Sequence, residues 1–128
     1  MKLNRIDHVA VICSNYEKSK RFYVEVLGCE VINEINRTER QSFALELSVN
    51  GLYQIELFSF PNPPKRLSNP EACGLRHLAF QVDDLEATIS ELKSKNVVIE
   101  EIRINTVNGK RFAFCRDPDG LPIELCEV

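Results

Sequence analysis

An internal repeat is the feature that most constrains how this chain folds. The segment "IDHVAVI" at residues 6–12 is matched by "LRHLAFQV" at 75–82, and the two histidines of the chain, His8 and His77, lie 69 residues apart. The same offset aligns Asn50-Gly51 with Asp119-Gly120, after which it slips to 68 and aligns "QIELF" (54–58) with "PIELC" (122–126). Two copies of one supersecondary unit therefore make up most of the chain.

Each copy is expected to form a strand, a helix and three further strands. Helices are predicted over 16–27 and 85–95, where apolar residues recur on one side. The remaining strands are predicted at 30–35, 42–49 and 53–60 in the first copy and at 98–104, 111–116 and 121–128 in the second. The predicted fold class is α+β, with two βαβββ modules and eight principal strands.

The ends of the two helices repeat as well. Ser14 followed by Glu17, and Asp83 followed by Glu86, have the spacing of a capping box, which predicts Ser14 and Asp83 as the N-caps. Each helix is followed by a residue type that tolerates left-handed backbone, namely Gly28 or Asn96.

The length of 128 residues suits one domain with a substantial core. We expect a single domain over 1–128, with module one at 1–60, a Pro-rich linker at 61–74 and module two at 75–128. The chain carries 16 basic and 19 acidic residues without a basic stripe, which argues against nucleic acid as a partner. Apolar runs are too short for a membrane span, and the N-terminus lacks the pattern of a signal peptide, so a cytoplasmic location is expected.

The five cysteines do not predict a disulfide framework or a finger-type zinc site. Their number is odd, and no pair has the C-x-x-C spacing. Most are expected to be small buried apolar residues, Cys13 above all, because it lies in a strand pattern. A reactive thiol at Cys115 or Cys126 stays open.

The repeat places two histidines and two glutamates at equivalent positions. His8 and His77 belong to the first strand of each module, and Glu56 and Glu124 stand in an I-E-L triplet of the last strand. Because a strand alternates its faces, the Ile and Leu of each triplet should pack under the helix while the glutamate faces the other way. The same alternation groups each histidine with a small alanine two residues later, which leaves room for a ligand.

These four residues are candidate metal ligands. A single strand histidine is usually a hydrogen-bonded structural residue, and a single strand glutamate is usually solvated, but four of them at repeat-equivalent positions weaken that interpretation. An unpaired carboxylate is costly to bury. A divalent metal shared with two imidazoles would remove that cost, and two His with two Glu suit zinc or nickel.

The chain resembles the glyoxalase, or vicinal oxygen chelate, superfamily. The resemblance covers the whole chain and rests on "IDHVAV", "QIELF", "GLRHLAF" and "DPDGLPIEL" in this order. It implies a cupped mixed sheet formed by the two βαβββ modules around one divalent metal. Carried over by position, the ligand set of glyoxalase I enzymes falls on His8, Glu56, His77 and Glu124. Zinc or nickel is expected, and cobalt, manganese or iron would also be compatible.

The resemblance implies a metal-dependent lyase or isomerase of glyoxalase I type. The expected reaction is proton transfer through a metal-chelated enediolate of a small α-hydroxycarbonyl or thiohemiacetal, with Glu124 or Glu56 as the catalytic base. The alternatives are a thiol transferase or dioxygenase of the same superfamily, and a small-molecule binding or resistance protein without catalysis. The ligand set favours the first, because transferases and dioxygenases of this kind typically use His, His and Glu only.

Substrate-binding residues and assembly complete the expectations. Among Arg40, Arg66, Lys110 and Arg111, we select Arg111, because it shares a strand face with Ala113, taken as the cup face. Gln81 alternates with His77 and is expected on the same face. The partners expected are a small-molecule substrate and a second copy of the chain in a homodimer. The sequence leaves open whether one chain or two form the site.

Overall fold

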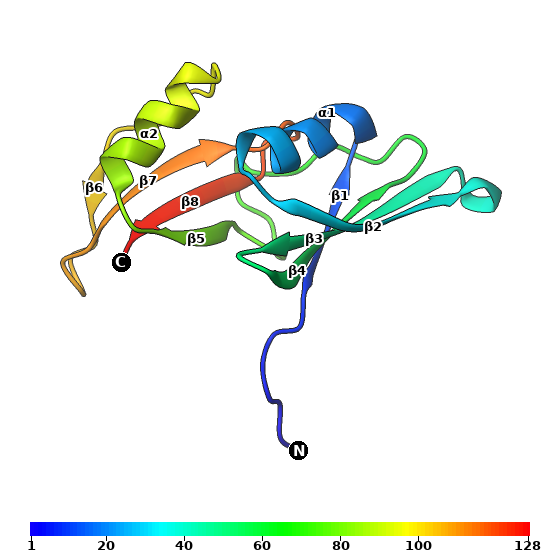
Figure 1. Cartoon of the computed structure of the whole chain (residues 1–128), viewed down its shortest axis with the longest axis horizontal. Coiled ribbons are helices and arrows are strands. Elements are labelled where there is room, and N and C mark those ends of the chain that lie inside the picture. Colours follow the sequence, from blue (N-terminus) through cyan, green and yellow to red (C-terminus); the bar gives the residue numbers. More distant parts are fainter. The chain divides into compact units, whose positions relative to one another are not determined.

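The computed structural model describes residues 1–128 as two compact units, Met1–Pro64 and Lys65–Val128 (Figure 1). Part of the predicted linker, from Lys65 onward, therefore belongs to the second unit. Neither α-helix has the length and hydrophobicity that crossing a membrane requires.

The first unit contains four strands and one helix that continues into a π-helical turn. In chain order the elements are β1 (Val9–Cys13), α1 (Tyr16–Arg21), the π turn η1 (Phe22–Val26), β2 (Glu30–Arg37), a 3₁₀ turn η2 (Thr38–Arg40), β3 (Ser42–Val49) and β4 (Leu52–Ser59). The sheet order is β1-β4-β3-β2, with β1 and β4 parallel and the other pairs antiparallel.

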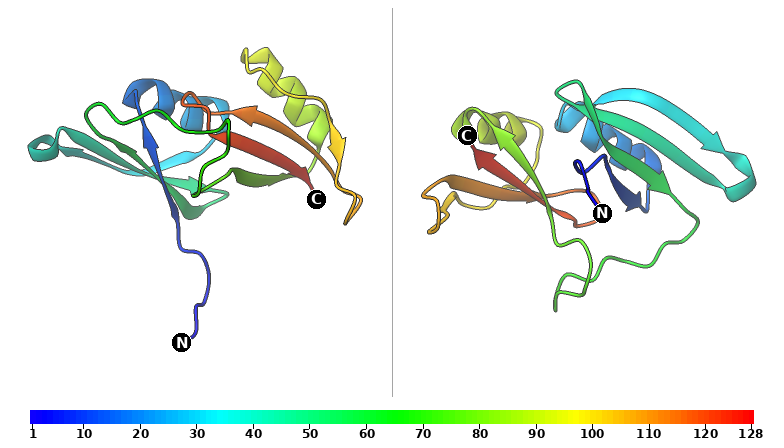
Figure 2. Two further views of the ribbon diagram at one scale, coloured as in Figure 1. Left: turned by 180° about the vertical axis from the view of Figure 1, so that it is seen from behind. Right: turned by 90° about the horizontal axis from the view of Figure 1, so that it is seen from below.

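The second unit repeats this order. Its elements are β5 (Leu78–Val82), α2 (Leu85–Ser94), β6 (Arg103–Ile104), β7 (Arg111–Arg116) and β8 (Pro122–Glu127). The sheet order is β5-β8-β7-β6, and again only the first pair is parallel. The α+β class and the two βαβββ modules are thus confirmed. In each unit the helix covers one face of the unit's own sheet (Figures 1 and 2).

The core of each unit lies between its helix and its sheet. In the first unit, Leu45 and Leu47 of β3 and Leu57 of β4 are fully buried, together with Tyr23. In the second unit the equivalent core is formed by Leu85, Leu92, Ala113, Ile123 and Leu125. Both helices end as predicted, because Gly28 and Asn96 adopt left-handed φ values of 78° and 62°.

The predicted N-caps are wrong by one residue. The side chain of Asn15, not Ser14, accepts a hydrogen bond from the backbone N–H of Lys18 at 3.0 Å. Asp84, not Asp83, does the same for Ala87 at 2.9 Å. In a capping box the glutamate stands three residues after the N-cap. Glu17 and Glu86 stand only two residues after the observed N-caps, so neither helix begins with a capping box. The caps nevertheless remain equivalent under the repeat.

Three predicted strands differ at their boundaries in ways that affect the site. The strand predicted over 98–104 is reduced to β6, Arg103–Ile104, although Glu100 still donates its backbone N–H to the Phe114 carbonyl at 2.9 Å. The strands β1 and β5 begin one residue after His8 and His77. Each histidine therefore lies at the entry of its strand.

Candidate functional site

In both units the glutamate of the I-E-L triplet lies on the sheet face away from the helix. Ile55 and Leu57 of β4 are buried, whereas the Glu56 side chain keeps 18% of its surface exposed. β4 lies between β1 and β3, and its Glu56 stands opposite Ala10. The second unit repeats this arrangement, with Glu124 of β8 opposite Ala79 of β5. The predicted alternation of faces is confirmed in both units.

Each unit brings its histidine and its glutamate together. The distance from His8 Nε2 to Glu56 Oε2 is 3.5 Å, and the distance from His77 Nε2 to Glu124 Oε2 is 2.9 Å. All four side chains are partly exposed, between 16% and 36%. The two pairs therefore carry equivalent donor atoms that an ion or a small molecule can reach.

Two neighbours hold the His8–Glu56 pair. Asp7 Oδ2 lies 2.9 Å from His8 Nδ1. Because an ionised carboxylate only accepts, Nδ1 carries the proton in this contact. The Tyr53 hydroxyl lies 2.5 Å from Glu56 Oε2, and its ring stacks on the His8 ring at a centroid distance of 5.0 Å. Tyr53 thus contacts both members of the pair.

The electrostatics around Tyr53 keep its hydroxyl protonated. Burial raises the pKa of Tyr53, and the hydrogen bond to Glu56 and the charges of Glu56, Glu46 and Asp7 raise it further. Glu46 lies directly opposite Glu56 on the neighbouring strand β3. A phenol in this setting remains a hydrogen-bond donor, so it can orient the Glu56 carboxylate across the physiological pH range.

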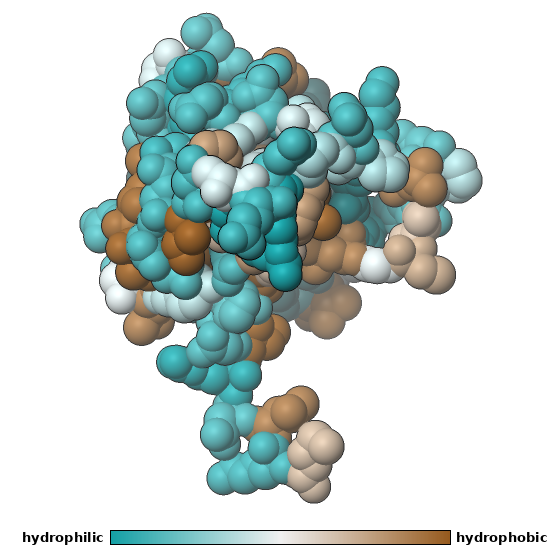
Figure 3. All heavy atoms as spheres, turned by 90° about the vertical axis from the view of Figure 1, so that its right-hand side faces the viewer, coloured by the Kyte–Doolittle hydropathy of each residue, from teal (hydrophilic) through white to brown (hydrophobic).

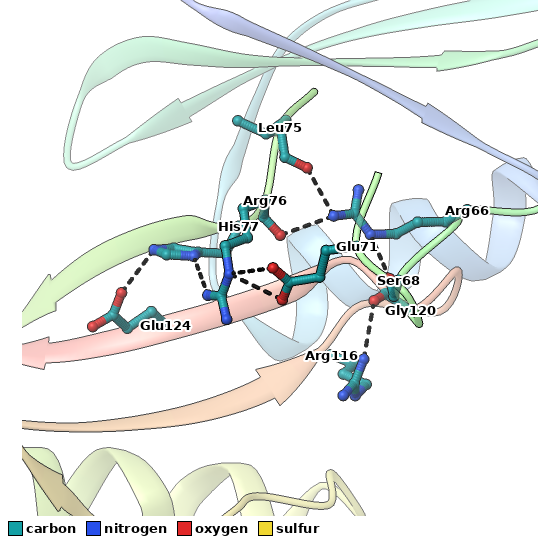
Figure 4. A network of polar contacts seen from close by, with 9 residues as sticks. All are labelled: Arg66, Ser68, Glu71, Leu75, Arg76, His77, Arg116, Gly120 and Glu124. Atoms are coloured by element: carbon teal, nitrogen blue, oxygen red, sulfur yellow. Dashed lines mark hydrogen bonds and ion pairs between the residues drawn. The ribbon is translucent and has the colours of Figure 1, made fainter. Parts of the chain in front are cut away.

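The His77–Glu124 pair has different neighbours (Figure 4). Arg76 Nη1 lies 3.1 Å from His77 Nδ1, and Phe114 meets the His77 ring edge-on at 5.4 Å. The thiol of Cys126 lies beside Glu124; burial, followed by the hydrogen bond with Glu124, raises the pKa of this thiol to about 11. A thiol with this pKa stays protonated near neutral pH, which argues against a nucleophilic Cys126.

The other four cysteines agree with the prediction that most cysteines are small buried apolar residues. Cys13, Cys29 and Cys115 are buried and Cys73 is exposed, and none of the four forms a disulfide. Burial raises the pKa of Cys29 and of Cys115 to about 11. Neither the buried Cys115 nor Cys126 has the environment of a reactive thiol.

The donor atoms of both pairs suit a divalent transition metal. Imidazole nitrogen and carboxylate oxygen are ordinary ligands of zinc and nickel. The contact between Asp7 and His8 is typical of a metal-binding histidine, since it directs the Nε2 lone pair outward. Neither unit contains a group of three or more His, Cys, Asp or Glu side chains that could hold a metal ion. Each unit by itself therefore brings together one His–Glu pair.

One predicted substrate residue is on the expected face and one is not. Gln81 is exposed and pairs with Cys126, on the face of His77 and Glu124. The prediction that Arg111 and Ala113 share this face is wrong. Ala113 lies opposite Leu125 and is fully buried towards α2, because β7 presents Phe114, not Ala113, beside Glu124.

The side chain of Arg111 is engaged elsewhere. It bonds to Glu86 of α2 and to Glu127 of β8, with a distance of 2.9 Å from Nε to Glu127 Oε2. The guanidinium lowers the pKa of both carboxyls. This cluster ties α2 to the sheet, so Arg111 has a structural role here.

Three residues that contact the two histidines or Glu56 were not predicted from the sequence. These are Asp7, Tyr53 and Arg76. A signal existed for two of them, because Asp7 and Arg76 directly precede the histidines and are themselves 69 residues apart. Tyr53 had no such signal, since its repeat equivalent, at an offset of 68, is the buried Leu121.

Comparison with known proteins adds an independent line of evidence. Residues 5–125 match the model of the Glyoxalase/Bleomycin resistance protein/Dioxygenase superfamily. The chain is 57% identical to the uncharacterized protein YwkD of Bacillus subtilis, with 99% of each chain covered. It is 30% identical to the mitochondrial methylmalonyl-CoA epimerase of Mus musculus, over 97% of this chain and 73% of the relative. The crystal structure of a glyoxalase family protein from Enterococcus faecalis superposes with a TM-score of 0.90 at 44% identity, covering 99% of this chain and 100% of that one.

Proposed function

Because the chain belongs to the Glyoxalase/Bleomycin resistance protein/Dioxygenase superfamily, we propose that it is a metal-dependent lyase or isomerase of glyoxalase I type. The substrate class is a small α-hydroxycarbonyl or thiohemiacetal, and the reaction is proton transfer at the carbon beside the carbonyl. The observation that carries the proposal is the recurrence of a close His–Glu pair on the same sheet face of both units. The similarity to an epimerase supports it, since inversion at a carbon can proceed by removal and return of a proton.

The ligands in this proposal are His8, Glu56, His77 and Glu124, and the cofactor is one divalent metal, zinc or nickel. When bound, the metal would supply Lewis acidity that stabilises negative charge on a substrate oxygen. The two pairs are half-sets in separate units, so the proposal requires both units to contribute, from one chain or from two.

Glu124 is the proposed base. Its strand begins directly after a turn that is held by Asp117, whose carboxylate accepts hydrogen bonds from the backbone N–H groups of Asp119 and Leu121, both at 2.9 Å. A strand that is fixed at its start holds the Glu124 carboxylate in one position, which is why we select Glu124 over Glu56 as the base.

The first test is the metal. Protein purified without added metal should contain about one equivalent of a divalent ion for each four-residue set, measured by inductively coupled plasma mass spectrometry. His8→Ala and His77→Ala should each lose most of it, because each loses a ligand and leaves a carboxylate poorly compensated. Full occupancy in both variants would show that the histidines are not ligands.

The second test is the proton transfer. Deuterium from solvent should enter the α-carbon of small hydroxyketones or of thiol–methylglyoxal adducts with the metal-loaded protein. Glu124→Gln should keep some metal and lower turnover by about 10²-fold or more, the usual scale for loss of a general base. Glu91→Gln, on the exposed side of α2, is the matched control and should retain the wild-type rate. Equal rates for wild type, Glu56→Gln and Glu124→Gln would remove both glutamates from the mechanism.

The same experiments separate the alternative functions. Protein that is free of metal yet binds small molecules would favour a binding or resistance protein. Full metal occupancy in Glu56→Gln, without deuterium incorporation in any form, would favour a thiol transferase or dioxygenase with three ligands.

We also propose that the chain forms a homodimer. The edge strand β2 is exposed nearly throughout and carries the apolar Val31, Ile32 and Ile35 on its surface. Hydrophobic side chains reach the surface among hydrophilic ones on the face drawn in Figure 3. Edge strands of this kind are usually covered. Sedimentation at micromolar concentration should give twice the chain mass, and a single species of 14.7 kDa would contradict the proposal.

A further inference from the structure

The contact between Arg76 and His77 determines where the proton of His77 lies. A guanidinium only donates hydrogen bonds, so the Nδ1 atom at 3.1 Å from Arg76 Nη1 must accept. The neutral imidazole then carries its proton on Nε2, which faces Glu124 Oε2 at 2.9 Å. His77 is therefore arranged as a hydrogen-bond donor to Glu124.

The other histidine is arranged in the opposite way. The carboxylate of Asp7 accepts from Nδ1 of His8 at 2.9 Å, which leaves the lone pair on Nε2. Asp7 and Arg76 occupy the same position of the repeat and have opposite charges. The two histidines thus have the same donor atoms and opposite tautomers.

A network of linker residues holds Arg76 in this place (Figure 4). Both carboxylate oxygens of Glu71 lie near Arg76 Nε, at 3.1 and 3.2 Å. Arg66 donates to the backbone carbonyls of Leu75 and Arg76 at 2.7 and 2.8 Å, which fixes the backbone that leads into His77. The linker therefore positions the guanidinium as well as connecting the units.

We propose that Arg76 is a positioning residue that holds His77 in the Nε2–H tautomer and so opposes metal binding by the His77–Glu124 pair. This inference rests on the proposed function for its metal part. If His77 bound a metal through Nε2, its proton would have to move to Nδ1, which now accepts from the Arg76 guanidinium. If His77 bound the metal through Nδ1, the metal would need the position that the guanidinium occupies. Either route requires Arg76 to leave His77 first, and its positive charge adds repulsion towards the incoming cation. Asp7 has the reverse effect on His8.

The tautomers can be measured without any metal. In metal-free, ¹⁵N-histidine-labelled protein at about pH 8, above the ordinary pKa of histidine, long-range ¹H–¹⁵N correlation spectra distinguish the two forms. We expect His77 as Nε2–H and His8 as Nδ1–H. Because the Glu124 carboxylate also favours the Nε2–H form, the contribution of Arg76 is measured with Glu124→Ala. His77 should remain Nε2–H in Glu124→Ala and should become a mixture of both tautomers in Arg76→Leu/Glu124→Ala, while His8 is unchanged. His77 as Nδ1–H in the wild-type protein would overturn the inference.

Metal titration then tests whether Arg76 weakens metal binding. By calorimetry with Zn²⁺ or Ni²⁺, Arg76→Leu should bind about 10-fold more tightly, since partners of ligating histidines typically change affinity by this factor or more. Glu71→Gln should shift affinity in the same direction by less, and Asp7→Asn should weaken binding. Arg116→Leu removes an exposed guanidinium elsewhere in the same unit and should leave affinity unchanged.

The outcomes separate this inference from the proposed function. Unchanged or weaker binding in folded Arg76→Leu would refute the opposing role of Arg76. If neither wild type nor any variant binds metal, the metal proposal is wrong, and the tautomer of His77 in Glu124→Ala with and without Arg76 decides whether Arg76 positions it.

Discussion

Replacing Asp117 with alanine is expected to destabilise the unit that carries Glu124. Asp117 is only 5% exposed, and one of its oxygens accepts the backbone N–H groups of Asp119 and Leu121, both at 2.9 Å. The backbone N–H of Asp117 itself donates to the Leu121 carbonyl at 2.9 Å. The side chain thus closes the turn from which β8 starts.

The loss of unfolding free energy in Asp117→Ala is estimated from the hydrogen bond that each backbone N–H loses. A hydrogen bond to a charged group contributes about 1.5–3 kcal/mol, and an unsatisfied buried donor costs a similar amount. The N–H of Leu121 is buried and finds no water in its place, whereas the N–H of Asp119 lies in a partly exposed turn. We therefore expect a loss of about 3 kcal/mol, most of it from Leu121. Asp117→Asn keeps an acceptor oxygen for both donors and should lose only about 1 kcal/mol.

Urea denaturation followed by circular dichroism measures both variants. Asp117→Ala should lower the midpoint with an unchanged slope, and its thermal midpoint should fall by about 10 °C, given that 1 kcal/mol shifts domains of about 60–100 residues by about 4–8 °C and domains of about 150–250 residues by about 2–4 °C. Equal losses in the alanine and asparagine variants would refute the reasoning, because the charge and not the acceptor geometry would then be the source.

The contacts of Arg111 and Tyr53 lead to two further predictions, one for stability and one for metal affinity. Arg111 lowers the pKa of Glu86 and Glu127, and a lowered carboxyl pKa contributes stability above the unfolded-state pKa of about 4.3 that is lost as pH falls through the lower folded-state value. Arg111→Gln should therefore be less stable than wild type at pH 7, with turnover retained, and the difference should shrink as pH falls below about 4.3 in a series of urea midpoints; a difference independent of pH would contradict this. Tyr53→Phe keeps the stacked ring but loses the donor to Glu56, so metal affinity should fall about 10-fold in competition with a chromogenic chelator, and unchanged affinity would exclude Tyr53 as an orienting group.

The features predicted correctly from the sequence are those that depend on backbone periodicity and turn chemistry. Strand alternation placed Glu56 and Glu124 opposite the buried Ile and Leu neighbours in both units. The left-handed residues after the helices, Gly28 and Asn96, followed from the small set of residue types that tolerate that conformation. These are local rules, and each was applied twice because of the repeat.

The errors arose where one residue of register decides the result. The face of Arg111 was misassigned because the pairing of β7 with β8, which puts Phe114 opposite Glu124, depends on the turn between them. Shifting a strand by one residue moves all of its side chains to the other face. The N-caps were predicted one residue too early for a similar reason. Asn15 and Asp84 each follow a residue whose type is equally suitable as an N-cap, so the sequence does not distinguish the two positions.

The two units share their strand order and the positions of the four candidate ligands, whereas the surroundings of the two His–Glu pairs differ. Glu56 faces Glu46 across the strands and is held by Tyr53, whereas Glu124 faces Phe114. Together with the carboxylate of Asp7, these neighbours give the first pair a more negative and more constrained environment, which favours holding a cation. The second pair has a guanidinium beside its histidine and no tyrosine hydroxyl on its carboxylate. From this difference in surroundings we expect the first pair to hold the proposed metal more tightly than the second, and Glu124 to exchange the proton in the proposed reaction.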